Sequence, residues 1–145
     1  QRQMCIRDRA GGVERVTTTY ESGQVDMELT TTEDVTTYQR VRIPSDARDR
    51  RTVGMLLRTL PLEAGYAAHL NRYLPVADLL DRVTLSVKGS EEVTVPAGTF
   101  DTWRIELDTR AAQEEVWIAT EPPYPLIKYT DSLNGGLFEL ESFTP

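Results

Sequence analysis

The stretch Val93-Thr94-Val95-Pro96-Ala97-Gly98-Thr99-Phe100 decides the local fold, because it contains a strand, a tight reversal and a second strand. Pro96 presets the backbone φ that suits the first central position of a type I turn. Gly98 then supplies a left-handed residue at no steric cost. The stretch therefore predicts a three-residue hairpin loop, in which a type I turn is closed by a glycine bulge.

This turn sets the register of a long antiparallel ribbon at about residues 83–109. Val95 should face Thr99 across the ladder, and Val87 should face Leu107. A slip of one residue would set apolar side chains against polar ones along both faces, so the turn and the alternation support each other. The predicted apolar face collects Val83, Leu85, Val87, Val93, Val95, Trp103, Ile105 and Leu107.

Three details of the ribbon can be checked. Lys88 should lie opposite Glu106, which is a favourable cross-strand pair. Glu91 should lie on the apolar face opposite Trp103, either exposed near a sheet edge or as a polar anchor for the head group of a ligand. Phe100 is left as a misfit on the polar face.

Length and composition indicate one folded domain. The chain has 145 residues, of which 39% are hydrophobic and 27% charged, so it can bury a core and is not a disordered segment. The net charge of −7 argues against binding to a nucleic-acid backbone. A basic run contains Arg40, Arg42, Arg48, Arg50 and Arg51, and we interpret it as a solvated loop and helix start in preference to an anion site.

The first nine residues look foreign to the domain. Residues 1–9 follow neither a strand nor a helix period and resemble translated sequencing-adapter read-through, so we expect them to pack poorly. Cys5 lies among them and is the single cysteine, which leaves residues 10–145 without a disulfide or a thiolate metal site. The chain starts at Gln1 with no signal peptide and no apolar run of membrane-spanning length. We therefore expect one β-rich domain at residues 10–145, truncated at its N-terminus, with no integral membrane segment.

Hydrophobic periodicity predicts mostly strands. Alternation and turn residues place further strands at residues 13–20, 25–31, 35–43, 65–74, 113–119, 126–130 and 137–143. An Asn134-Gly135 turn should join the last two and set Tyr129 against Leu140. Residues 46–60 carry one apolar helical stripe of Val53, Leu56, Leu57 and Leu60. The predicted fold class is mainly β (α+β), a curved, half-barrel-like antiparallel sheet of about eight or nine strands with one amphipathic helix packed on it.

Residues 93–102 resemble the signature of a large uncharacterised family of bacterial envelope domains. Residues 56–66 resemble the helix of that family and its following strand, and residues 115–129 resemble its closing strands. The family is similar in fold to periplasmic lipoprotein-carrier proteins, which are half-barrels whose helices cover an apolar face that holds acyl chains. The resemblance implies a periplasmic or envelope-associated domain, and the carrier role transfers only by analogy.

The residue types that carry catalysis are sparse. His69 is the single histidine and is interpreted as a strand residue, because no nucleophile elbow accompanies it. One histidine and one excluded cysteine leave no set of zinc ligands, and we expect no metal or cofactor. The neighbouring pairs Glu91-Glu92 and Glu114-Glu115 should point to opposite faces of their strands. Trp103 and Trp117 could line a pocket or simply fill the core.

Two functions remain open. The first is a non-enzymatic envelope domain that binds an apolar ligand, such as a lipid or a lipidated protein, between the helix and the curved sheet. The second is a structural or protein-interaction module with a filled core and no ligand. A hydrolase is a weaker third candidate, because its catalytic base would have to be His69. The residues expected to form the ligand-binding wall are Trp103, Ile105, Leu107, Val87, Leu85, Leu56 and Leu60.

Overall fold

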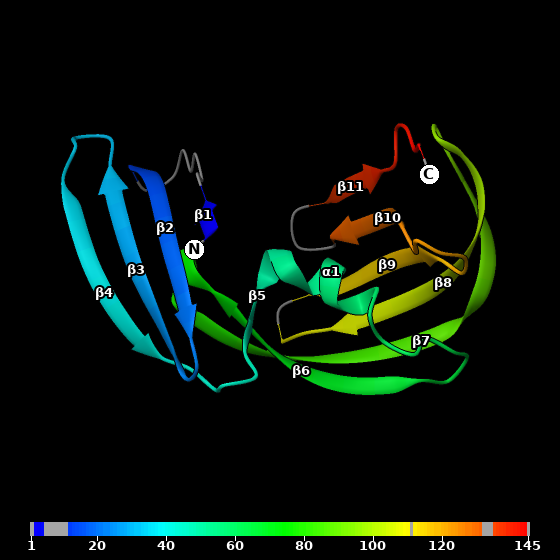
Figure 1. The fold of residues 1–145 in the computed structure, drawn as a ribbon, viewed down its shortest axis with the longest axis horizontal. Helices are drawn as coiled ribbons and strands as arrows, with labels where there is room; N and C mark the ends of the chain where they lie inside the picture. Colours follow the sequence, from blue (N-terminus) through cyan, green and yellow to red (C-terminus); the bar gives the residue numbers. More distant parts are fainter. Residues whose placement is uncertain (1, 5–11, 111, 132–134, 145) are drawn as a thin grey trace.

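The computed structural model describes residues 2–4, 12–110, 112–131 and 135–144, which form two β-sheets and one short helix (Figure 1). The smaller sheet has four strands in the order β1-β2-β3-β4. Its strands are β1 (Arg2–Met4), β2 (Val13–Glu21), β3 (Gln24–Thr31) and β4 (Thr36–Arg42). All three strand pairs of this sheet are antiparallel.

The larger sheet has seven strands in the order β11-β10-β9-β8-β7-β6-β5, and it curls around the helix as a half-barrel (Figure 1). Only the β5–β6 pair is parallel among the described residues of this sheet. The predicted mainly β, curved, half-barrel-like fold with one packed helix is confirmed. The strands are β5 (Arg48–Asp49), β6 (Ala67–Leu74), β7 (Leu79–Val95), β8 (Gly98–Asp108), β9 (Gln113–Ala119), β10 (Leu126–Asp131) and β11 (Gly136–Glu139), with 3-10 turns at Arg50–Thr52 and Pro75–Ala77.

The helix is much shorter than the predicted span of 46–60. Helix α1 covers Val53–Leu57, directly after the 3-10 turn. Two contacts delay its start: Arg48 and Asp49 pair with β6, and the carboxylate of Asp49 caps the turn by accepting from the amide of Arg51 at 2.8 Å. The apolar face of the helix nevertheless packs on the sheet as predicted, because Val53 and Leu57 are buried there.

The β7–β8 hairpin is also tighter than predicted. Val95 pairs with Gly98, not Thr99, so only Pro96 and Ala97 lie between the paired residues. Gly98 has a φ of +133°, as the turn requires of a glycine. A bulge between Val87 and Gly89 then shifts the register a second time.

The bulge moves the outer half of the hairpin to the other face of the sheet. Val87 pairs with Ile105 on the concave face, whereas Val93 pairs with Phe100. Phe100 is therefore not a misfit, because it and Val93 pack in a second cluster on the convex face. The predicted placement of Val93 and Val95 beside Leu85 was wrong, since the sequence pattern did not reveal the bulge. The buried members of this convex cluster are Val95, Trp117, Ala119 and Ile127.

The main core lies on the concave face, under α1. Its buried members are Val53, Leu57, Val83, Leu85, Val87, Ile105, Leu107, Val116 and Ile118. Full burial of a side chain such as Leu57, which is 0% exposed, stabilises the fold by about 1.5–3 kcal/mol. Strand β9 serves both clusters, because Val116 and Ile118 face the concave core while Trp117 and Ala119 face the convex one.

A third cluster joins the two sheets. Tyr73 of β6 packs with Val25 and Met27 of β3. Ile43 and Ala47, from the loop between β4 and β5, complete the cluster. The hydroxyl of Tyr73 donates to the carboxylate of Asp78 at 2.7 Å. The small sheet is thus fixed to one end of the half-barrel.

Short strands lie near both ends of the described chain. Arg2–Met4 pairs with β2 as β1, and the expectation that residues 1–9 pack poorly stays a prediction, because Cys5 and most of that segment lie outside the described residues. At the other end, β10 and β11 pair Tyr129 with Phe138, not with Leu140. The strand β11 ends at Glu139, and Asn134 of the predicted Asn134-Gly135 turn also lies outside the described residues.

Candidate functional site

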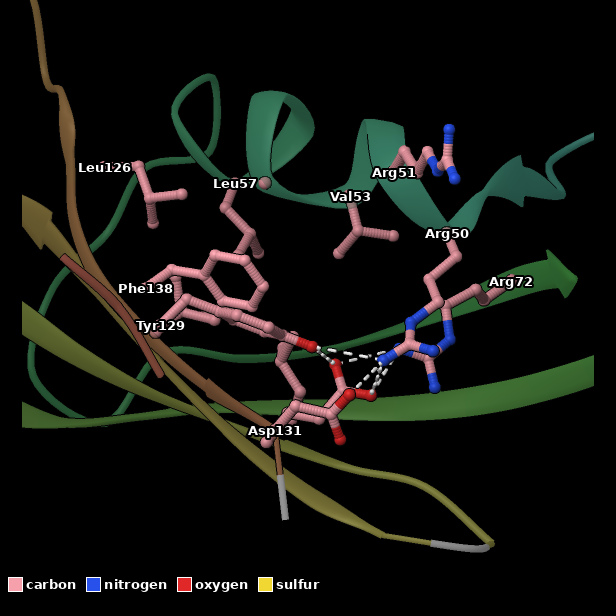
Figure 2. Close-up of a pocket in the computed structure, with 13 residues that line it drawn as sticks. Arg50, Arg51, Val53, Leu57, Arg72, Leu126, Tyr129, Asp131 and Phe138 are labelled. Carbon is pink, nitrogen blue, oxygen red and sulfur yellow. Dashed lines mark hydrogen bonds and ion pairs between the residues drawn. The ribbon is translucent and has the colours of Figure 1, made fainter. Parts of the chain in front are cut away.

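A half-open cavity of about 340 Å³ lies between α1 and the concave face of the larger sheet (Figure 2). The 3-10 turn and α1 form its roof, and β8, β9, β10 and β11 contribute most of the remaining wall. The residues around it are Arg50, Arg51, Val53, Gly54, Leu57, Arg72, Leu107, Glu114, Val116, Leu126, Tyr129, Asp131 and Phe138.

The wall of the cavity is amphipathic. One part is hydrocarbon, from the side chains of Val53, Leu57, Leu107, Val116, Leu126 and Phe138. The other part is a cluster of charged side chains at one end, drawn with their contacts in Figure 2. Gly54 leaves the roof thin, because a Cβ added there would first meet Cδ2 of Leu126 at 3.9 Å.

Arg72 is the centre of the charged end. Its Nη1 donates to both carboxylate oxygens of Glu114, at 2.9 and 3.0 Å, and its Nη2 donates to Asp81 at 3.1 Å. These three side chains are 4–5% exposed. Charges buried to this degree are tolerated only when they are paired and hydrogen-bonded. Two atoms of this group, Nε of Arg72 and Oδ1 of Asp81, nevertheless have no hydrogen-bond partner among the described residues.

Arg50 extends the charged end toward the mouth of the cavity. Its Nη2 donates to Asp131 at 2.7 Å and to the hydroxyl of Tyr129 at 3.4 Å, and it lies 3.6 Å from Glu114. Burial opposes the charge of Arg50, but hydrogen bonds to Tyr129 and Asp131 and the charge of Glu114 raise its pKa. Arg50 therefore stays a cation and ties the roof to β9 and β10.

Tyr129 joins the two arginine groups. Its hydroxyl donates to Oε2 of Glu114 at 2.9 Å while it accepts from Arg50. Burial raises the pKa of Tyr129, Arg50 opposes that shift, and the charge of Glu114 reinforces it. The phenol therefore remains protonated at neutral pH and acts as a donor to Glu114.

The predicted ligand wall is mostly filled core. Leu85, Val87, Ile105 and Leu107 are 0–3% exposed beneath the helix. Trp103 and Leu60 are partly buried against the same cluster, and Leu56 is half-buried. Of the seven predicted residues, Leu107 alone lines the cavity.

Other sequence candidates lie away from the cavity wall. His69 is exposed in β6, as expected of a strand histidine, with Nδ1 3.3 Å from the hydroxyl of Thr84. Glu91 lies opposite Thr102, not Trp103, and accepts a hydrogen bond from the indole of Trp117. Lys88 and Glu106 form the predicted ion pair at 2.9 Å, although Ser86 and not Lys88 lies opposite Glu106 in the ladder.

The charged end was missed by sequence reasoning, although a signal existed. Asp81 continues the inward stripe of Val83 and Leu85 by one period-2 step, and Glu114 does the same for Val116 and Ile118. A charged residue at the inward end of each of two apolar stripes indicates a buried pair. Glu114 and Glu115 do point to opposite faces as predicted, since Glu114 binds Arg72 and Glu115 binds Arg104.

Arg50 corrects the interpretation of the basic run as wholly solvated. Its neighbours Arg48 and Arg51 are exposed, but the side chain of Arg50 is only 30% exposed and binds Asp131. The described residues contain no group of three or more His, Cys, Asp or Glu side chains arranged to hold a metal ion. Within the same residues, no helix has the length and apolar character needed to span a membrane.

A curved half-barrel with a short helix over an amphipathic cavity defines this protein as a mainly β domain with an internal cavity. The chain belongs to DUF3108, a family described as protein of unknown function, whose family model matches residues 8–136. Membership of an uncharacterised family is thus confirmed, while the envelope setting and the carrier similarity stay predictions. No curated protein and no solved structure matches the chain.

Proposed function

We propose that this domain is a non-enzymatic binding module of the bacterial envelope, which holds a small apolar ligand, or the acyl chain of a lipidated partner, between α1 and the curved sheet. The observation that carries the proposal is the cavity of about 340 Å³ under α1. This volume is at the lower end of the range for ligand pockets, about 300–1,000 Å³. At about 30 Å³ per water-sized group, it has room for on the order of ten non-hydrogen atoms.

The chemistry of the wall supports a ligand with a hydrocarbon chain. The cavity has a wall of aliphatic and aromatic side chains, such as Leu57, Leu126 and Phe138, and a single polar end. An apolar chain would remove this surface from water at about 25 cal/mol per Å². A non-catalytic role is favoured because the lining carboxylates of Glu114 and Asp131 are engaged by arginines. The envelope setting rests on the family resemblance of residues 93–102.

Native mass spectrometry and calorimetric titration test this proposal. Gently purified protein should carry a small adduct or bind eight-carbon probes with a stoichiometry of one. Replacing Gly54 by Met should abolish that binding, because its side chain would fill the cavity that Gly54 lines. Gly54→Ala adds only a Cβ in ordinary contact with Leu126 and is the matched control that should still bind. A clean apo mass, with no heat from any probe, would refute ligand binding.

A second candidate is a protein-interaction module without a ligand. It is favoured by β4, which is an edge strand of the small sheet and carries Tyr38 at 78% exposure. An unpaired edge is a template for another strand. Tyr38 also borders an open hollow of about 500 Å³ on the outer face, together with the ion pair of Asp26 and Arg40. Failure of all probes in the titration would favour this module.

A further inference from the structure

The charged end of the cavity has unused hydrogen-bond donors. In the described structure Arg50 donates hydrogen bonds only from Nη2, so its Nη1 and Nε have no partner there. Nε of Arg72 is buried and has no partner among the described residues, which is costly unless something accepts from it. Both arginines line the cavity, and Arg50, whose side chain is 30% exposed, can offer its free nitrogens to an acceptor that enters from the mouth.

The acceptors on the same wall are already engaged. Both oxygens of Glu114 accept from Arg72, and Oε2 also accepts from Tyr129. Oδ2 of Asp131 accepts from Arg50. The lining carboxylates are therefore engaged by donors of the protein while Arg50 keeps unused donors, so an accepting head group fits the wall better than a donating one.

The formal charges of the side chains at this end further restrict the class of head group that can bind. The two guanidinium groups of Arg50 and Arg72 face the three carboxylates of Asp81, Glu114 and Asp131, whose side chains are 4–7% exposed. A carboxylate ligand would add a second uncompensated negative charge to this cluster, because the Arg51 side chain is directed away from it in Figure 2. An ammonium ligand would improve the charge balance but would bring only donors to a wall with surplus donors.

We infer that the cavity selects an uncharged acyl ester, whose carbonyl oxygen accepts from the free nitrogens of Arg50 and whose chain lies along Leu57, Val116 and Leu126. This inference rests on the proposed function, because it names the ligand class of the same cavity. An ester of about eight acyl carbons matches the room for on the order of ten non-hydrogen atoms.

The experiment compares three probes of equal chain length on the unmodified protein at pH 7.5: methyl octanoate, octanoate and octylamine. We expect methyl octanoate to bind about tenfold more tightly than either charged probe, as one additional hydrogen bond would give. Tighter binding of octanoate or octylamine, or equal binding of all three, would overturn the ester inference while leaving the cavity as a binding site. Binding of none of them would instead refute the proposed function.

A pair of neighbouring variants tests the role of Arg50. Arg50→Lys keeps the cation beside Asp131 but removes Nη1 and Nε, so the preference for the ester should fall about tenfold to near unity. Arg48→Lys is the control, because Arg48 is an exposed arginine two residues before Arg50 and does not line the cavity. An unchanged ester preference in the folded Arg50→Lys variant, with thermal melting as the check on folding, would overturn the assignment to Arg50.

Discussion

Arg72 of β6 and Glu114 of β9 form a buried ion pair, although β7 and β8 lie between their strands in the sheet. Three strand spacings amount to about 14 Å along a flat sheet. Curvature of the half-barrel shortens that path on the concave side and brings the two side chains to 2.9 Å. The pair therefore closes the curve of the sheet from inside, at the end where the cavity begins.

Removal of Arg72 should destabilise the domain strongly. Arg72→Met leaves Asp81 buried without a cation and leaves Glu114 with only the more distant Arg50, at 3.6 Å. We therefore expect a loss of about 3–5 kcal/mol in the free energy of unfolding, measured by urea denaturation. Lys88→Met is the matched control, because it breaks an ion pair whose lysine is 43% exposed, and it should cost about 0–1 kcal/mol. Similar losses for the two variants would contradict the assignment of Arg72 as a buried structural centre.

Two glycines should respond to alanine in opposite directions. Gly54 lies in α1 with room for a Cβ, so Gly54→Ala should stabilise the protein by up to about 1 kcal/mol. Gly98 has a φ of +133°, where an alanine is strained, so Gly98→Ala should lower the free energy of unfolding by more than about 1 kcal/mol. Thermal melts of both variants check the signs, and destabilisation by Gly54→Ala would mean that α1 does not hold the described geometry.

The indole of Trp117 depends on Glu91 as its acceptor. Glu91→Ala should leave a largely buried N–H without a partner and cost about 1–3 kcal/mol in unfolding free energy. Glu92→Ala removes the same charge one residue further on, from an exposed side chain without a described contact, and should change stability by about 0.5 kcal/mol or less. The tryptophan emission spectrum should shift only in the Glu91 variant; a shift common to both would point to a general charge effect.

Three tyrosines should resist ionisation in the folded protein. Burial is the main cause that raises the pKa of Tyr20, Tyr73 and Tyr129 above the ordinary value of 10.0. The charge of Asp49 adds to the shift at Tyr20, and a hydrogen bond to Asp78 adds to it at Tyr73. Because the folded pKa values lie above the unfolded ones, the associated stability is complete below about pH 10 and is lost as the pH rises through the folded values.

Absorbance at 295 nm measures this effect. Between about pH 10 and 11, the native protein should show less tyrosinate than the urea-unfolded protein. Tyr129→Phe should reduce the difference between the two curves, whereas Tyr38→Phe, at an exposed position, should leave it unchanged. Coincident titration curves for native and unfolded protein would contradict the burial of all three phenols.

The sequence predicted the class of fold because alternation in β7, β8 and β9 is regular and the helical stripe of Val53 and Leu57 is clear. It mispredicted the register because one extra residue at Lys88–Gly89 leaves the period-2 pattern intact on both sides while changing which face each side meets. The short helix was hidden for a similar reason, since pairing of Arg48 with β6 and the cap by Asp49 are tertiary contacts.

The site was harder to predict than the fold. Its polar end combines residues from five separate segments, and the pairing of Arg72 with Glu114 depends on sheet curvature that no local pattern encodes. The predicted wall residues Leu85, Val87 and Ile105 were correctly placed inside, but complete packing under α1 makes them core. The inward positions of Asp81 and Glu114 could have been inferred from the stripes that they continue.

The bulge at Lys88–Gly89 has one further consequence. The bulge turns Val93 and Val95 to the convex face, so that the tip of the hairpin packs with Leu140 near the end of the chain. There the amide of Ala97 donates to the carbonyl of Leu140 at 3.0 Å. The two halves of β7 therefore have different roles: the first half forms part of the interior, and the second half leads into a turn that binds Leu140, far away in the sequence. Changes at the hairpin tip would then loosen the last strands without touching the floor of the cavity.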